Sequence, residues 1–247
     1  MSAGPRIASG EPTFLGREVP APVGNYKWVY LWGLPIRAMH WIAAVCVVTL
    51  AVTGLYIGRP YFMGNPAEPG QIMTRFRLAH YLAATFLVMT GIVRVYWLFA
   101  GNRFERLKAL FPIRRRDIRN LFRMIGFYLM IQPEKAPRYL GHNPLQQLNY
   151  TLVYLVATLE VITGVILFSQ AVPTGIMYRL VNWMTPLFGG LQNVRFIHHV
   201  ITWFFVIFIP AHVYLAFRAD VIGGGGTVSS IITGGRFFEA DRHYEDE

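Results

Sequence analysis

The amino-acid sequence predicts an all-α membrane protein, a four-transmembrane-helix bundle with both termini in the cytoplasm. The chain of 247 residues is 54% hydrophobic and 15% charged, with a mean hydropathy of +0.37. Soluble domains are rarely so apolar. Four apolar runs, near 38–58, 78–100, 148–170 and 196–217, can each cross a hydrocarbon core, which takes about 20 helical residues. Basic residues gather beside these runs, as they do in the cytoplasmic loops of membrane proteins.

The four runs predict one membrane domain, 1–247, because no long polar insert separates them. In lipid the backbone must satisfy its own hydrogen bonds, so each run should be a helix. The single cysteine, Cys46, excludes a disulfide within the chain and a Cys-x-x-Cys-His haem attachment. The start of the chain, residues 1–25, is polar and lacks the apolar core of a signal peptide, so we expect the first span to direct insertion.

The net charge of +10 reflects membrane topology and not nucleic-acid binding, because ten of the 23 Lys and Arg residues lie between Arg103 and Arg138. This concentration predicts a cytoplasmic basic loop, 101–147. Within it, residues 105–131 mix basic and apolar side chains, which fits either one or two helices at the membrane surface or a cytoplasmic helical hairpin. After the last span, Gly223 to Gly226 predict a flexible link to an acidic C-terminal tail, 219–247.

Four histidines lie in or at the edges of the spans, and ionisable residues in a bilayer are functional candidates. His198 and His212 are 14 residues apart, which is about 21 Å along a helix and returns to nearly the same face. With the second span running opposite to the first, His40 falls at the cytoplasmic depth of His212 and His80 at the outer depth of His198. Helical phase favours His198 over its neighbour His199 but leaves both open.

Two bis-histidine sites at two depths fit two non-covalent b-type haems, since neutral imidazoles on both sides of haem iron suit electron transfer. The candidate iron ligands are therefore His40, His80, His198 and His212. Zinc is disfavoured because it would need third and fourth ligands at each depth.

Three further residues lie where the same helix faces meet a haem. Gly54 and Gly91 would let a flat macrocycle approach the backbone, or they are helix-packing glycines. Arg94 would pair with a haem propionate, or it extends to the membrane interface. Glu160, in mid-span, fits a proton relay, a partner for a ligand histidine, or a buried protonated acid.

Three motifs resemble the b-type cytochrome subunit of membrane-bound nickel–iron hydrogenases. The first is Arg37-Ala38-Met39-His40-Trp41 followed by Leu50-Ala51-Val52-Thr53-Gly54, the second is Tyr139-Leu140-Gly141-His142-Asn143-Pro144, and the third combines His198-His199 with His212-Val213-Tyr214. The resemblance covers about residues 28–236. The Arg-x-x-His-Trp piece is also similar to related diheme cytochromes, including formate dehydrogenase gamma subunits.

The resemblance implies a multi-pass diheme cytochrome b in the bacterial cytoplasmic (inner) membrane. It would anchor a periplasmic hydrogenase made of an iron–sulfur small subunit and a nickel–iron large subunit, and pass electrons from H2 to quinone. By analogy with the formate dehydrogenase subunit, the candidate quinone contacts are Tyr139, His142 and Asn143. Asn143 before Pro144 also fits a helix cap. The family usually has a neutral residue where this chain has Glu160, so the resemblance implies no role for it.

Three functional classes remain at this point. The chain is an electron-transfer subunit of a hydrogenase, without hydrogenase chemistry of its own, or a cytochrome b subunit of a formate dehydrogenase-like complex. It is alternatively a stand-alone diheme quinol oxidoreductase. A non-haem transporter or passive anchor is disfavoured, because transporters usually carry internal repeats and broken helices that this sequence lacks.

Overall fold

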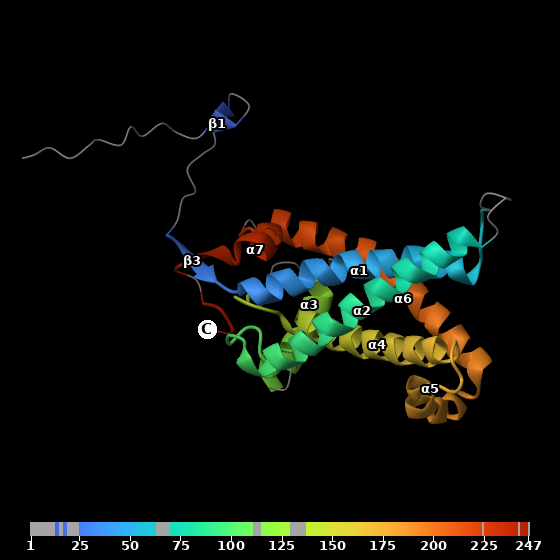
Figure 1. The fold of residues 1–247 in the computed structure, drawn as a ribbon. Helices are drawn as coiled ribbons and strands as arrows, with labels where there is room; N and C mark the ends of the chain where they lie inside the picture. Colours follow the sequence, from blue (N-terminus) through green and yellow to red (C-terminus); the bar gives the residue numbers. More distant parts are fainter. Residues whose placement is uncertain are drawn as a thin grey trace, which may run out of the picture.

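The computed structural model describes residues 13–14, 17–18, 25–62, 70–110, 115–128, 137–223, 225–241 and 243–246. Four long helices run side by side as a bundle (Figure 1): α1 Leu34–Gly58, α2 Gln71–Ala100, α4 Pro144–Ser169 and α6 Leu191–Gly223. All four are long and apolar enough to span a membrane. Few of their side chains are buried within the chain, as expected for helices that face lipid. The prediction of four spanning helices is therefore confirmed.

The spanning helices begin earlier than the apolar runs predicted, at residues 34, 71, 144 and 191 instead of 38, 78, 148 and 196. Polar residues near the helix starts explain the difference, because a hydrocarbon count leaves out Arg37 of α1, Arg75 and Arg77 of α2, Gln146 and Gln147 of α4 and Arg195 of α6. Local signals fix two of the starts. Pro35 lies in the first turn of α1, and Asn143 caps α4 in a reciprocal capping box with Gln146.

Strand β3, which precedes α1, and the described segment that follows α6 lie at one end of the bundle, which we call the strand end (Figure 1). There β3 Tyr26–Tyr30 pairs antiparallel with β4 Gly235–Glu239, and α7 Thr227–Thr233 precedes β4. A short antiparallel pair, β1 Thr13–Phe14 and β2 Arg17–Glu18, lies further toward the N-terminus. The opposite, loop end carries α5 Ile176–Val181 and the 3-10 helix η3 Asn182–Phe188.

The acidic tail is folded in the residues that the structure describes, whereas the expected flexible link at 223–226 is only partly described and stays a prediction. Gly226 has a φ of +77° and starts α7, a conformation that glycine adopts without strain. Behind β4, a small core forms at the strand end from Leu31, Phe104, Leu140, Phe238 and Tyr244. The expectation about residues 1–25 falls almost wholly outside the described residues.

The basic segment between α2 and α4 contains a short 3-10 turn, η1 Leu107–Ala109, and one amphipathic helix, α3 Arg115–Tyr128. The buried face of α3 carries Asp117, Asn120 and Met124. Ile118 and Phe122 remain exposed beside it. Residues 111–114 and 129–136 of the predicted loop lie outside the described residues.

Candidate functional site

The structure brings the four span histidines together as two pairs. At the loop end, the ring centres of His80 on α2 and His198 on α6 are 6.5 Å apart. At the strand end, the ring centres of His40 on α1 and His212 on α6 are 6.3 Å apart. Each pair thus joins two helices, and α6 contributes one ring to each.

These separations fit a metal ion held between two imidazoles. A five-membered ring with bonds of about 1.33 Å has a radius of about 1.1 Å. A metal–imidazole bond is about 2.0 Å long, so rings on opposite sides of one metal have centres about 6.2 Å apart. The observed 6.5 and 6.3 Å match this value. A direct ring-to-ring hydrogen bond would need about 5 Å, from an N–N distance of about 3 Å.

The loop-end rings each rest on a threonine–glycine pair of a neighbouring helix. On α1, Thr53 Oγ1 lies 2.9 Å from Nδ1 of His80. A Cβ added to Gly54 would meet Cε1 of the same ring at 3.3 Å. The close approach at Gly54 is therefore made by the imidazole, which explains why this position has no side chain.

The arrangement repeats on α4. Thr163 Oγ1 lies 2.9 Å from Nδ1 of His198, and a Cβ on Gly164 would meet Cε1 of that ring at 3.2 Å. Both threonine hydroxyls donate within their own helix: Thr53 to the carbonyl of Thr49 at 2.6 Å, and Thr163 to that of Leu159 at 2.9 Å.

This network assigns the tautomer of both rings. Because each hydroxyl proton is used inside its helix, Oγ1 accepts from Nδ1–H, and the lone pair of Nε2 is left to bind a metal. The sequence reasoning missed Thr163 and Gly164 as site residues and gave Thr53 no role. The signal was present, because Val52-Thr53-Gly54 and Ile162-Thr163-Gly164 repeat the same Thr-Gly step in two spans.

The strand-end pair has a different surrounding. Among the described residues, no side chain donates to or accepts from the ring of His40 or His212. Aromatic rings flank the pair instead: Trp41 lies edge-on to His40 at 5.4 Å, and Phe208 stacks on His212 at 5.6 Å. A Cβ at Gly91, predicted to lie near this depth, would meet nothing within 4 Å. Gly91 therefore makes no close packing contact within the described chain.

Arg94 points into the bundle. Its Nε donates to the hydroxyl of Tyr154 on α4 at 2.9 Å, and its Nη1 donates to the carbonyl of Glu105 at 3.1 Å. The structure thus adds two protein partners to a residue for which a propionate or the membrane interface was predicted.

The loop before α4 holds the three predicted quinone contacts in different settings. The ring of His142 lies between Trp32, with ring centres 4.6 Å apart, and Tyr150, at 4.4 Å. Burial, and then the charge of Arg94, lower the pKa of His142 to about 3, so this ring is neutral at physiological pH.

The other two side chains of this loop already have partners. The Asn143 side chain caps α4, because its Oδ1 accepts a hydrogen bond from the backbone N–H of Gln146 at 2.9 Å. A helix cap was the alternative to a quinone contact that the sequence offered for this residue. The hydroxyl of Tyr139 accepts from Nδ2 of Asn120 on α3 at 2.9 Å. Burial raises the pKa of Tyr139.

Comparisons with known proteins identify the family. Residues 31–234 match the family described as prokaryotic cytochrome b561. The chain belongs to this family. It is 36% identical to the probable Ni/Fe-hydrogenase B-type cytochrome subunit of Azotobacter chroococcum mcd 1 over 223 residues, 87% of this chain and 90% of the relative. The protein of the same name from Cupriavidus necator is 33% identical over 87% of this chain and 89% of the relative. The probable Ni/Fe-hydrogenase 1 B-type cytochrome subunit of Escherichia coli K12 is 27% identical over 84% and 90%.

Membership in the cytochrome b561 family makes this chain a multi-pass b-type cytochrome of the inner membrane. The residues fit its haem. The ring centres of each pair are separated by about the length of two metal–imidazole bonds, and at the loop end the Nδ1 contacts leave the Nε2 atoms for a metal. No cluster of three or more His, Cys, Asp or Glu side chains that would suit zinc occurs in the described part of the chain. Each imidazole pair is a candidate site for haem iron.

The geometry also separates His198 from His199. The ring of His199 is exposed and faces α1, where a Cβ on Gly58 would meet its Cε1 at 3.3 Å. Gly58 lies one turn beyond Gly54 on α1, so the ring of His199 is not the one that pairs with His80. His198 is therefore the stronger ligand candidate of the two.

Proposed function

We propose that this cytochrome is a diheme subunit that anchors a periplasmic uptake hydrogenase and transfers electrons from H2 oxidation to the membrane quinone pool. The observation that carries the proposal is the presence of two imidazole pairs at two depths of one bundle, with ring centres 6.5 and 6.3 Å apart. His198 and His212 are separated by 14 residues, or about 21 Å along α6. Bound bis-imidazole haem would supply one-electron redox chemistry at each depth.

The direction of transfer follows from the charge of the loops. The basic segment 101–147 reaches the strand end with Phe104 and Leu140, which pack there beside Leu31 and Phe238. The positive-inside rule assigns this end to the cytoplasm, together with both termini. The loop end then faces the periplasm, and His80 and His198 are the pair near that face. The curated relatives are named as subunits of Ni/Fe hydrogenase, which supports a hydrogenase as the electron donor. We place its iron–sulfur small subunit at the loop end, with the nickel–iron large subunit beyond it.

The electron count is consistent with quinone as the acceptor. Oxidation of H2 to two protons releases two electrons, and reduction of a quinone to a quinol consumes two electrons and two protons. Electrons enter at the level of His80 and His198 and leave at the level of His40 and His212.

Among the three candidate quinone contacts of the loop before α4, the side-chain hydrogen bonds favour His142. Of Tyr139, His142 and Asn143, only His142 has a side chain whose polar atoms are bonded to no described side chain. As a neutral ring beside Tyr150 and Arg94, it can offer one hydrogen bond to a quinone carbonyl. Tyr139 and Asn143 shape this loop through Asn120 and through the cap of α4.

The test begins with haem content. The purified protein should give a reduced-minus-oxidised spectrum with a b-type band and about two haems per chain by pyridine assay, on the bis-histidine argument. His212→Ala should lose one haem together with quinone reduction. His199→Ala is the matched control and should keep both haems. A colourless preparation from haem-replete cells, or two haems retained in His212→Ala, would refute the proposal.

The partner is tested separately. Co-purification of a nickel-containing hydrogenase from gently solubilised membranes supports the subunit assignment. Co-purification of a formate-oxidising complex, or quinol oxidation by the isolated chain with a soluble oxidant, would favour one of the two alternative functions.

A further inference from the structure

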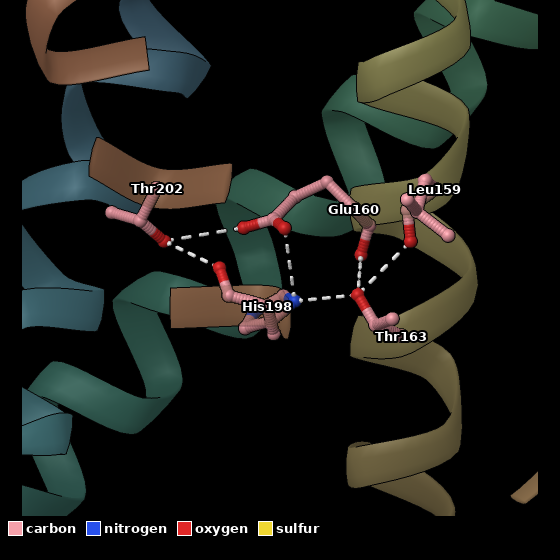
Figure 2. Close-up of polar contacts among 5 residues, drawn as sticks. All are labelled: Leu159, Glu160, Thr163, His198 and Thr202. Carbon is pink, nitrogen blue, oxygen red and sulfur yellow. Dashed lines mark hydrogen bonds and ion pairs between the residues drawn. The ribbon is translucent and has the colours of Figure 1, made fainter. Parts of the chain in front are cut away.

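Glu160 lies beside the Nδ1 atom of His198, one of the two loop-end rings. Its Oε2 is 3.3 Å from Nδ1 of His198 (Figure 2). Thr163 Oγ1 approaches the same nitrogen at 2.9 Å. The shorter contact makes Thr163 the hydrogen-bond acceptor of the Nδ1 proton. Oε2 of Glu160 is buried, has no hydrogen-bond partner among the described residues, and lies next to the same nitrogen.

The position of Glu160 follows from helix geometry. Residues 160, 163 and 164 have the i, i+3, i+4 spacing that puts side chains on one face of a helix. The face of α4 that holds His198 with Thr163 and Gly164 therefore carries Glu160 one turn earlier. The side chain is further held from α6, because the hydroxyl of Thr202 lies 3.2 Å from Oε1. Thr202 itself is one turn after His198.

The other half of the loop-end site provides an internal comparison. On α1, the position three residues before Thr53 is Leu50, where α4 has Glu160 three residues before Thr163. His80 thus has one side-chain oxygen at its Nδ1 and His198 has two, although the Thr-Gly seats are otherwise alike. Among the described residues, the rings of the strand-end pair have no such side-chain partner.

An acceptor at Nδ1 makes a ligating imidazole a stronger electron donor through Nε2, which stabilises the oxidised metal relative to the reduced one. We propose that Glu160 is a positioning residue for His198 that lowers the reduction potential of the haem held by His80 and His198 below that of the haem held by His40 and His212. This order favours electron flow from the loop end to the strand end. The proposal rests on the proposed diheme function.

The experiment compares Glu160→Leu, which copies Leu50 of α1, with the unmodified protein by spectroscopic redox titration at one fixed pH. We expect the lower of the two midpoint potentials to rise, with about a tenfold change in the oxidised-to-reduced ratio of that haem, or 59 mV for a one-electron couple. The other midpoint should not move. Repeating the substitution in His212→Ala, which should retain only the loop-end haem, assigns the shift to that haem.

Thr158→Val is the matched control, because Thr158 is exposed on α4 only two residues away and bonds the carbonyl of Tyr154 in its own helix. It should leave both potentials unchanged. If Glu160→Leu loses the loop-end haem, the isosteric Glu160→Gln decides, and a smaller rise in the same midpoint is expected.

Two haems with unchanged midpoints in Glu160→Leu, or no rise in Glu160→Gln, would overturn the role of Glu160 while leaving the diheme function intact. Absence of haem from the unmodified protein would instead refute the proposed function itself, and this inference with it.

Discussion

Adding one methyl group at Gly54 or Gly164 tests whether the loop-end rings are seated for metal binding. The new Cβ atoms would lie 3.3 and 3.2 Å from Cε1 of His80 and His198, against 3.4 Å or more for an ordinary contact. Each ring would have to move by a few tenths of an ångström. The hydroxyls of Thr53 and Thr163 oppose this movement, because they fix Nδ1 from the same side.

The magnitude can be worked out against Gly91→Ala, whose Cβ meets nothing within 4 Å. All three substitutions share the helix-propensity gain of Ala over Gly, about 1 kcal/mol. Overpacking costs about 1–3 kcal/mol, and ligand sites tolerate displacements of only about 0.5 Å. Relative to Gly91→Ala, haem affinity should therefore fall roughly 5- to 100-fold, at 1.4 kcal/mol per factor of ten.

The assay is the rate of haem transfer from each detergent-solubilised variant to an excess of a haem-free acceptor protein, followed by absorbance. Affinity changes within one site appear mostly as dissociation rates, so loss should be faster in Gly54→Ala and Gly164→Ala. Only one of the two haems should be affected. Loss rates equal to those of Gly91→Ala would refute the tight seat, and faster loss of both haems would show a general disturbance of the bundle.

Three further predictions follow from contacts of single side chains. Thr53→Val should weaken haem retention at the loop end more than Thr163→Val, because His198 would still have the Glu160 carboxyl beside its Nδ1 whereas His80 would have no side-chain partner. An unpaired buried N–H group costs about 1–3 kcal/mol, and the same transfer assay measures the difference. The Asp246 carboxylate accepts hydrogen bonds from the backbone amides of Leu140 and Gly141 at 2.6 and 2.8 Å. Asp246→Ala should therefore speed hydrogen exchange of these two amides by about tenfold or more. His142 has a pKa lowered to about 3, so between pH 6.5 and 3 the unfolded chain binds a proton that the folded chain does not. The free energy of unfolding should therefore fall as the pH drops through this window, by up to about 1.4 kcal/mol per pH unit. His142→Asn should make this fall less steep.

Asp241, an exposed residue of the tail, serves as the control for the exchange measurement. Asp241→Ala should leave the exchange of the loop amides unchanged. An Asp246→Ala protein with unaltered exchange would contradict the hydrogen bonds that the Asp246 side chain accepts from Leu140 and Gly141. An acid transition that is equally steep with and without His142 would contradict its burial as a neutral ring.

Helical periodicity explains why the histidine pairs could be predicted. A regular helix fixes both rise and rotation per residue, so 14 residues between His198 and His212 give a depth difference and a shared face without knowledge of the neighbouring helices. The alternation of span directions then assigns partners by depth. The observed ring pairs, His80 with His198 and His40 with His212, follow this pattern.

The surroundings of the rings could not be predicted in the same way, because they depend on which faces of different helices meet. In an isolated helix, Thr53 and Thr163 would each only bond a backbone carbonyl one turn earlier. They contact the histidine rings because α1 packs beside α2 and α4 packs beside α6. Glu160 was ambiguous for the same reason. A proton relay, a partner for a ligand histidine and a buried protonated acid were all open for it, and only the packing of α4 on α6 showed that its carboxyl lies beside His198.

The tail shows a further limit of reading charge and glycine content locally. An acidic, glycine-preceded segment suggests a solvated chain, but β4 finds its partner in β3, some 200 residues earlier in the sequence. Asp246 then accepts from the backbone of the loop before α4.

The sequence alone determined the number of spans, their apolar lengths and the depths of the histidines, because lipid imposes helical geometry on any long apolar run and helical geometry is periodic. Only the tertiary structure decided which atoms orient the loop-end rings, that His198 and not His199 faces His80, and that β3 and β4 form one sheet. These features depend on contacts between segments distant in the sequence, and helical periodicity alone does not fix which faces of two helices meet.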